Sequence, residues 1–175
     1  MKVSRSLMIL LVVVAAAALI AGCHMKPRVS TAGPSKAAVA KSAPDKRPLT
    51  PMYSAAEKGD LKAVEALIKK GADVNEVGKG GSTALKIAAS KGNLPLVKLL
   101  VQHGASLEIK NDEGWTALMT AARNGYKDVT DYLIAKGADV KAVGNNGDTL
   151  LHFAAAGGNL ELVKLFLTKG IALEV

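Results

Sequence analysis

The sequence predicts an all-α repeat solenoid, because three sets of markers recur at a spacing of 33 residues in four helix-turn-helix units. One set of glycines consists of Gly71, Gly104, Gly137 and Gly170. A second set consists of Gly59, Gly92, Gly125 and Gly158. The third is a series of Ala-Ala pairs at residues 55–56, 88–89, 121–122 and 154–155. Such a period indicates stacked units that bury their core between neighbours, which suits binding better than catalysis.

The first helix of each unit is expected to begin after a threonine and to end at a glycine of the second set. A threonine oxygen can accept a hydrogen bond from the free N–H groups of the first turn. The residues in this position are Thr50, Thr83, Thr116 and Thr149. The Ala-Ala pairs make this helix thin, so that its neighbour can approach closely. The glycines can then end the helix in the left-handed conformation.

The second helix of each unit is predicted by apolar residues at i, i+3 and i+4. In unit two they are Leu94, Leu96, Val97, Leu99, Leu100 and Val101. Lys127 and Thr130 interrupt this pattern in unit three, which is therefore expected to pack least well. The last helix of unit four is apolar, and no polar capping unit follows it. We expect that a partner or a second copy covers its outer face, or else that the last unit frays.

The residues around the markers resemble a known repeat. Residues 81–89 read Gly-Ser-Thr-Ala-Leu-Lys-Ile-Ala-Ala, and residues 147–155 read Gly-Asp-Thr-Leu-Leu-His-Phe-Ala-Ala. Unit one ends with Gly-Ala-Asp-Val-Asn at residues 71–75. These segments resemble the ankyrin repeat, with its Gly-x-Thr-Pro-Leu-His-x-Ala-Ala core and its Gly-Ala-Asp-Val-Asn ending. The resemblance implies that His152 makes bracing hydrogen bonds between units.

The resemblance covers residues 48–175 and implies an ankyrin repeat domain of four units joined by β-hairpin-like fingers. The expected repeats span about residues 48–77, 78–110, 111–143 and 144–175.

The first 22 residues have the pattern of a cleaved secretory signal peptide. Two basic residues precede an unbroken apolar run at residues 7–22, which is shorter than the roughly 20 residues that span a bilayer. The run leads into Ile-Ala-Gly-Cys at residues 20–23, which resembles the bacterial lipobox. The resemblance implies cleavage before Cys23, the only cysteine of the chain, and lipidation of that residue. His24 follows in place of the Asp that often retains lipoproteins at the inner membrane. The expected location is therefore the outer membrane, facing the periplasm.

The positive charge of the chain is concentrated near its N-terminus. Residues 1–47 hold eight Lys and Arg against one Asp, which accounts for +7 of the formal net charge of +8. The predicted array is thus nearly neutral, which argues against a nucleic-acid-binding face. Residues 23–47 are rich in Lys, Pro, Ala and Ser and are expected to form a disordered basic tether. The tether is expected either to lie along an anionic lipid surface or to act as a soluble spacer.

No set of residues predicts catalysis, a cofactor site or a metal site. The three histidines, His24, His103 and His152, have no spacing suited to a shared metal ion. The glycines at residues 78, 80 and 81 are not followed by the Gly-Lys-Ser/Thr of a phosphate-binding loop. We therefore expect a protein that is not an enzyme.

Trp115 is the predicted anchor for a protein partner. It is the only tryptophan, it follows Gly114 in a finger, and this position in ankyrin repeats faces the concave groove. Tryptophan is common among interface hot spots. The alternative is that Trp115 only packs across neighbouring fingers. Further binding candidates on the fingers are Lys79, Ser82, Asp112, Glu113, Asn145, Asn146 and Asp148. Those on the inner helices are Ser90, Lys91, Arg123 and Asn124.

Together these features predict a lipid-anchored ankyrin stack that binds an unidentified protein in the bacterial cell envelope. The alternative is a structural envelope lipoprotein that self-associates through its uncapped last repeat.

Overall fold

The computed structural model describes residues 47–171. Contacts divide the chain into two units, residues 1–41 and residues 42–175. The predicted signal peptide, Cys23 and the tether up to residue 46 lie outside the described residues. No helix within the described residues has the length and apolar character needed to cross a membrane.

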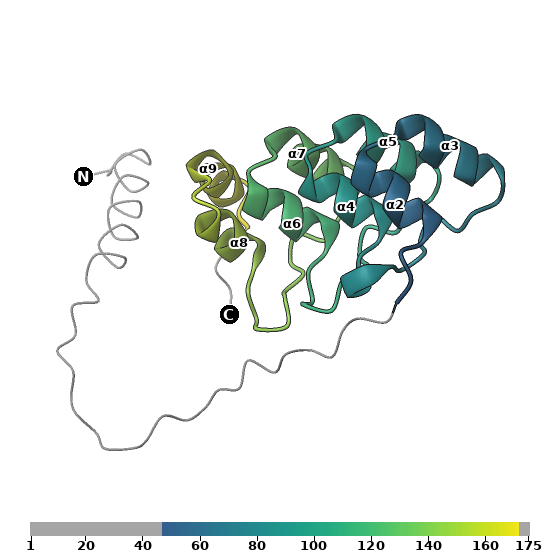
Figure 1. The fold of residues 1–175 in the computed structure, drawn as a ribbon. Coiled ribbons are helices and arrows are strands. Elements are labelled where there is room, and N and C mark those ends of the chain that lie inside the picture. Colours follow the sequence, from purple (N-terminus) through teal and green to yellow (C-terminus); the bar gives the residue numbers. More distant parts are fainter. Residues whose placement is uncertain (1–46, 172–175) are drawn as a thin grey trace, which may run out of the picture. The chain divides into compact units, whose positions relative to one another are not determined.

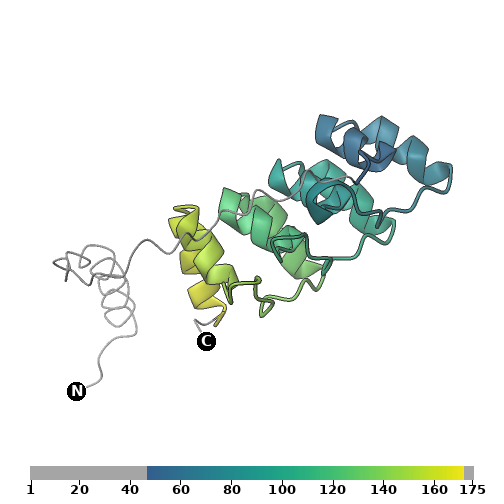
Figure 2. The ribbon, with the colours of Figure 1, turned by 60° about the horizontal axis from the view of Figure 1, so that its bottom comes forward.

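The described residues form an all-helical array of four units, as predicted (Figure 1). The inner helices are α2 (Pro51–Lys58), α4 (Ala84–Ser90), α6 (Ala117–Asn124) and α8 (Leu150–Ala156). The outer helices are α3 (Leu61–Lys69), α5 (Leu94–Gln102), α7 (Lys127–Ala135) and α9 (Leu160–Thr168). Contacts between α2 and α4, α4 and α6, and α6 and α8 form one layer, and those from α3 to α5 to α7 lie in the other. Figure 2 shows the helix pairs following one another along the array.

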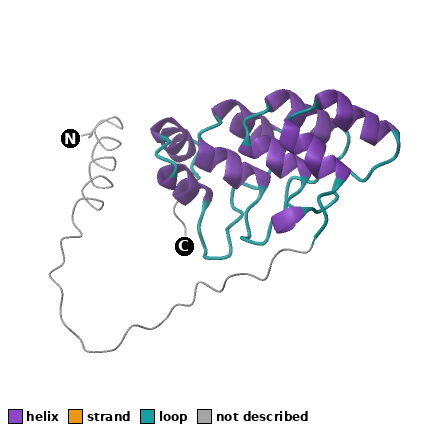
Figure 3. Ribbon diagram, viewed as in Figure 1, coloured by secondary structure: helices purple, strands orange, loops and turns teal. Residues whose placement is uncertain are grey.

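The fingers between units have the turns of hairpins but not their strands. A short 3-10 helix, η1 (Lys79–Gly81), forms the first finger tip, and no strand occurs among residues 47–171 (Figure 3). Each finger is closed by a backbone N–H that donates to the carbonyl four residues later, at 2.9–3.1 Å. The pairs are Gly78 with Ser82, Asn111 with Trp115, and Gly144 with Asp148. One such bond per finger holds the turn without forming a ladder.

The predicted helix ends are confirmed in most positions. The hydroxyl oxygens of Thr50, Thr83 and Thr116 each accept a hydrogen bond from the N–H three residues later, at 3.1–3.3 Å. The second glycine set has φ between +66° and +78°, the left-handed region in which a side chain would be strained.

His152 departs from the expected role. Its Nδ1 accepts a hydrogen bond from the Thr149 N–H at 3.2 Å and lies 2.8 Å from the Thr149 hydroxyl oxygen. Both contacts stay within unit four, so the bracing bonds between units that the resemblance implied are not made by this residue. Its side chain is exposed, and no further inner helix packs against α8 within residues 47–171 on the side away from α6.

The packing between units shows why the last repeat differs. Ala56, Ala89 and Ala122 have no exposed surface, because the next inner helix lies directly against each of them. Ala155 holds the same position in unit four and is exposed. Leu160, at the start of α9, is 61% exposed. The apolar outer face predicted for the last unit is therefore present and uncovered.

Unit three contains a buried polar atom where the apolar pattern is interrupted. Thr130 on α7 is completely buried, and its hydroxyl has no hydrogen-bond partner. Lys127 instead points to solvent and pairs with Asp131 at 3.0 Å, within one turn of α7. The interruption at Thr130 therefore costs stability through an unsatisfied hydroxyl, while the one at Lys127 lies on the surface.

We predict that Thr130→Val raises the free energy of unfolding by about 1 kcal/mol, because valine keeps the shape and removes the unpaired hydroxyl. Urea unfolding followed by circular dichroism measures this change. Thr120→Val is the matched control, since the buried Thr120 hydroxyl donates to the Thr116 carbonyl at 3.0 Å and its loss should lower stability. A Thr130→Val protein no more stable than the parent would contradict the assignment.

Candidate functional site

Trp115 lies on the limb of a finger that leads into α6. The finger turn precedes it, closed by the Gly114 N–H donating to the Asn111 carbonyl at 2.8 Å, with Gly114 at φ +79°. The Trp115 N–H donates to the Asn111 side-chain oxygen at 2.8 Å. Trp115 is therefore one residue past the turn and directly before the helix cap Thr116.

The indole ring of Trp115 contacts side chains from three units. Phe153 of α8 meets it edge-on, with ring centroids 5.1 Å apart and an angle of 76° between the planes. The Arg123 guanidinium carbon is 4.6 Å from the ring centroid, and Lys86 Nζ of α4 is 5.8 Å from it. The ring is half-buried. Trp115 thus packs across neighbouring units and also keeps accessible surface, so its role in partner binding stays a prediction.

Lys86 is the most unusual charged residue of this site. It is only 7% exposed, and this burial lowers the pKa of its ammonium group to about 8 against the opposing effect of Glu113 and Asp112. Among residues 47–171 its Nζ has no hydrogen-bond or ion-pair partner within contact distance, apart from the Trp115 ring. A buried cation without a carboxylate partner is costly for folding, which makes Lys86 a candidate for function.

Sequence reasoning missed Lys86, although the repeat register contained a signal. Lys86 comes three residues after the cap Thr83, the position that Met119 and His152 hold in the following units. Lys86 Nζ lies 5.8 Å from the centroid of the Trp115 ring, so in unit two this position reaches the following finger. A lysine there is therefore directed to the side of Trp115.

Asp112, one of the predicted binding candidates, is held by partners within the protein. Arg47 donates to its carboxylate from both terminal guanidinium nitrogens, Nη1 and Nη2, and the bond from Nη1 to Oδ1 is 3.0 Å. The Asp112 N–H donates to the Gly80 carbonyl at 3.1 Å, and its carbonyl accepts from Asn145 Nδ2 at 3.2 Å. Asp112 thus joins three fingers and the segment that precedes α2.

The other predicted residues divide into two groups. Asn124 donates from its side chain to the Ser90 carbonyl at 2.9 Å, and Ser82 and Asp148 close their fingers through their carbonyls. The remaining ones are exposed, at Lys79, Lys91, Glu113 and Asn146. Of the predicted binding candidates in the described residues, Arg123 alone contacts the Trp115 ring. The other two ring contacts come from Lys86 and Phe153, which were not among the candidates.

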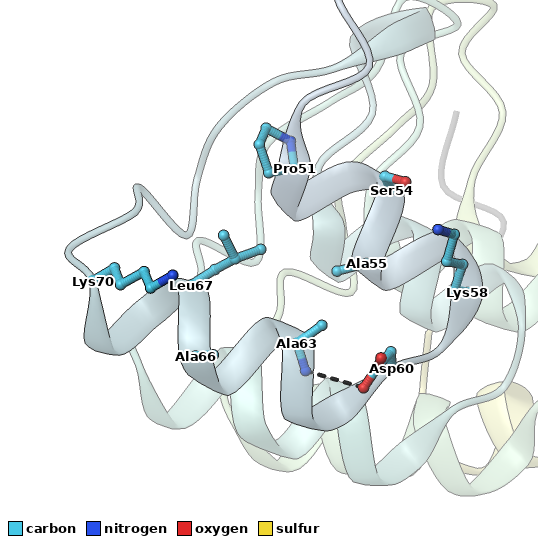
Figure 4. Close-up of a pocket in the computed structure, with 9 residues that line it drawn as sticks. All are labelled: Pro51, Ser54, Ala55, Lys58, Asp60, Ala63, Ala66, Leu67 and Lys70. Carbon is cyan, nitrogen blue, oxygen red and sulfur yellow. Dashed lines mark hydrogen bonds between the residues drawn. The ribbon is translucent and has the colours of Figure 1, made fainter.

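A hollow lies at the N-terminal end of the described array, between α2 and α3 (Figure 4). It has a volume of about 400 Å³ and is lined by Pro51, Ser54, Ala55, Lys58, Asp60, Ala63, Ala66, Leu67 and Lys70. Asp60 caps α3 by accepting from the Ala63 N–H at 3.0 Å. In unit four the corresponding Asn159 instead donates to the Ala122 and Arg123 carbonyls of the preceding unit, at 3.1 and 2.9 Å. A carboxylate cannot donate in this way, and within the described residues no helix pair precedes α2 and α3.

We predict that Lys86→Met removes a pH-dependent part of the stability. The pKa of Lys86 is about 8 in the folded state and near its ordinary 10.5 when unfolded, so between these values the unfolded chain binds the extra proton. Stability of the parent should therefore rise with pH in this window, on the order of 2 kcal/mol between pH 7 and pH 10 relative to Lys86→Met. Urea unfolding of both proteins at several pH values measures the difference. Parallel curves for the two proteins would show that Lys86 titrates normally.

The comparisons agree with this architecture. A family model described as "Ankyrin repeats (3 copies)" matches residues 30–111 and residues 105–175. A comparison with curated proteins found no match. The two matched ranges include all four helix pairs and most of the chain. The chain therefore belongs to the ankyrin-repeat family.

Proposed function

We propose that this protein is a membrane-anchored interaction module of the bacterial cell envelope, which captures a protein partner on the surface around Trp115. Ankyrin repeats in general bind protein partners, and the chain belongs to that family. The observation that supports the location is the half-buried Trp115 ring, which side chains from three units fix in place while part of it remains accessible.

The proposed mechanism is recognition by a preformed surface. Inner helices and fingers hold the side chains around Trp115 before a partner arrives, so little conformational freedom is lost on binding. Tryptophan and arginine are the residue types that most often dominate interface energies, and here they are in contact. No group of three or more metal-ligating side chains occurs within residues 47–171. The proposed activity is binding, and it rests on the membership of the chain in a family that binds protein partners.

Membrane attachment is the second part of the proposal. The lipobox-like residues 20–23 support lipidation of Cys23 after removal of residues 1–22. The basic segment at residues 23–47 would then connect the lipid to the array, and His24 favours the outer membrane and the periplasm. One acyl group gives only weak membrane binding, so a stable anchor needs the several chains that lipoprotein processing adds.

Self-association through the last repeat is the alternative. The exposed Ala155 and the 61% exposed Leu160 support it, because an inner unit buries the corresponding alanine completely. The N-terminal hollow is a poor receptor for this face, since Asp60 cannot donate to the carbonyls of a preceding unit. A mass measurement after detergent extraction separates the two functions, because a self-associating array is at least dimeric without any partner.

We predict that Cys23→Ser blocks maturation and moves the protein from the detergent phase to the aqueous phase. The serine hydroxyl cannot form the thioether that carries the lipid. Phase partitioning and the mass of the intact chain measure both effects. A Cys23→Ser protein that still partitions with detergent and still loses residues 1–22 would disprove the anchor.

We predict that Trp115→Ala weakens capture of the envelope partner at least tenfold, as expected when a central interface aromatic is removed. The partner is first identified by crosslinking in intact cells and mass spectrometry. Capture by the variant is then compared with capture by the parent.

Tyr132→Ala is the matched control for this experiment. Tyr132 is also half-buried in unit three and also contacts two cations, Lys98 and Lys136, but it lies on the outer helix α7. Circular dichroism establishes that both variants remain folded. Equal capture by the two variants would show that Trp115 only packs across neighbouring units and does not bind the partner.

A further inference from the structure

We infer that the Trp115 surface recognises a carboxylate of its partner, held between the side chains of Lys86 and Arg123 beside the indole ring. This inference rests on the proposed binding function and specifies the chemistry of the partner.

The first observation is that two cations share one aromatic ring. Lys86 Nζ and the Arg123 guanidinium carbon lie 5.8 and 4.6 Å from the centroid of Trp115. Within the described part of the chain neither cation forms an ion pair, since the pairs there join Arg47 with Asp112, Lys69 with Glu65, and Lys127 with Asp131. Two like charges near one ring repel each other, and an anion that contacted both would offset that repulsion.

The second observation is that the nearby acids do not supply this anion. Asp112 is bound by Arg47. The Glu113 side chain is exposed, and its carboxylate lies 3.5 Å from the Asn111 amide. Both acids act on Lys86 only through space, and burial still lowers the pKa of the ammonium group to about 8. The site therefore holds a largely buried lysine whose ammonium group has no acceptor among the side chains of residues 47–171 and still reaches solvent.

A single carboxylate fits the site better than a more highly charged group. Its two oxygens match the planar fork of an arginine and can also accept from an ammonium group. The indole ring provides an apolar wall for the rest of an acidic side chain. The charges of Glu113 and Asp112 act on Lys86, so they would repel a dianion such as phosphate more strongly than a single carboxylate.

A second pair of cations, around Tyr132, shows that burial of one cation distinguishes the Trp115 site. Lys98 and Lys136 lie 5.8 and 5.7 Å from the Tyr132 ring, nearly the Lys86 distance. Both of these lysines are exposed, so water satisfies their ammonium groups. Among residues 47–171, only the Trp115 site combines paired cations with the burial of one of them.

The test uses the full chain in detergent and follows the indole N–H signal of Trp115 by NMR. The signal is unambiguous because the chain has one tryptophan. The probes are three peptides: acetyl-Gly-Leu-Glu-Leu-Gly-amide, its Gln counterpart, and the Gln counterpart with a free C-terminal carboxylate. We expect the Glu peptide to bind with a dissociation constant on the order of 1 mM, about tenfold more tightly than the amidated Gln peptide. Binding of the free-carboxylate peptide alone would identify a chain terminus as the source of the same group.

Two variants and one control complete the test. Lys86→Met and Arg123→Met should each weaken binding of the carboxylate peptide about tenfold, to the level of the amidated Gln peptide. Arg123 is exposed, so its variant cannot fail merely by unfolding the core. Lys98→Met is the control. It removes the same single positive charge from the outer helix α5, away from Trp115, and should bind the peptide as the parent does.

Equal affinity for all three peptides, or full binding by both variants, would overturn the inference. The proposed function would survive that result if Trp115→Ala still abolished capture of the cellular partner, so the two failures can be told apart.

Discussion

The close approach of neighbouring inner helices is the constraint on which the rest of the array depends. Ala56, Ala89 and Ala122 have no exposed surface, and any larger side chain at these positions would hold successive units apart. This approach also brings the fingers within hydrogen-bonding distance, as between Asp112 and the Gly80 carbonyl at 3.1 Å. The geometry around Trp115 thus follows from the smallest side chains of the core.

The candidate site is a product of stacking, because no single unit contains it. Unit two contributes Lys86, unit three contributes Trp115 and Arg123, and unit four contributes Phe153. A buried lysine is unfavourable within a repeat taken alone. In the stack the next unit places an aromatic ring beside it, which offers the ammonium group a cation–π contact.

The sequence predicted the repeats far better than the side chains between them. Threonine caps and left-handed glycines depend on local backbone geometry, so Thr50, Thr83 and Thr116 and the glycines after the inner helices were predicted correctly. Trp115 could be singled out as the only tryptophan. Its contacts with Lys86 and Phe153 depend on how adjacent units pack, and the bond of Arg47 to Asp112 joins residues 65 positions apart. Local patterns contain no information about such distant pairs.

The short span of the contacts between units has a consequence for how the chain folds. Side-chain hydrogen bonds from one unit to the next join residues only 29 to 37 positions apart, from Asn75 with Gly104 to Asn159 with Ala122. Chains with such local contacts close small loops and cross low entropic barriers, so they fold rapidly. Any adjacent pair of units can serve as the nucleus, and order can then spread in both directions. A nascent chain can therefore begin to fold once its first two units have emerged, before the last repeat has been made.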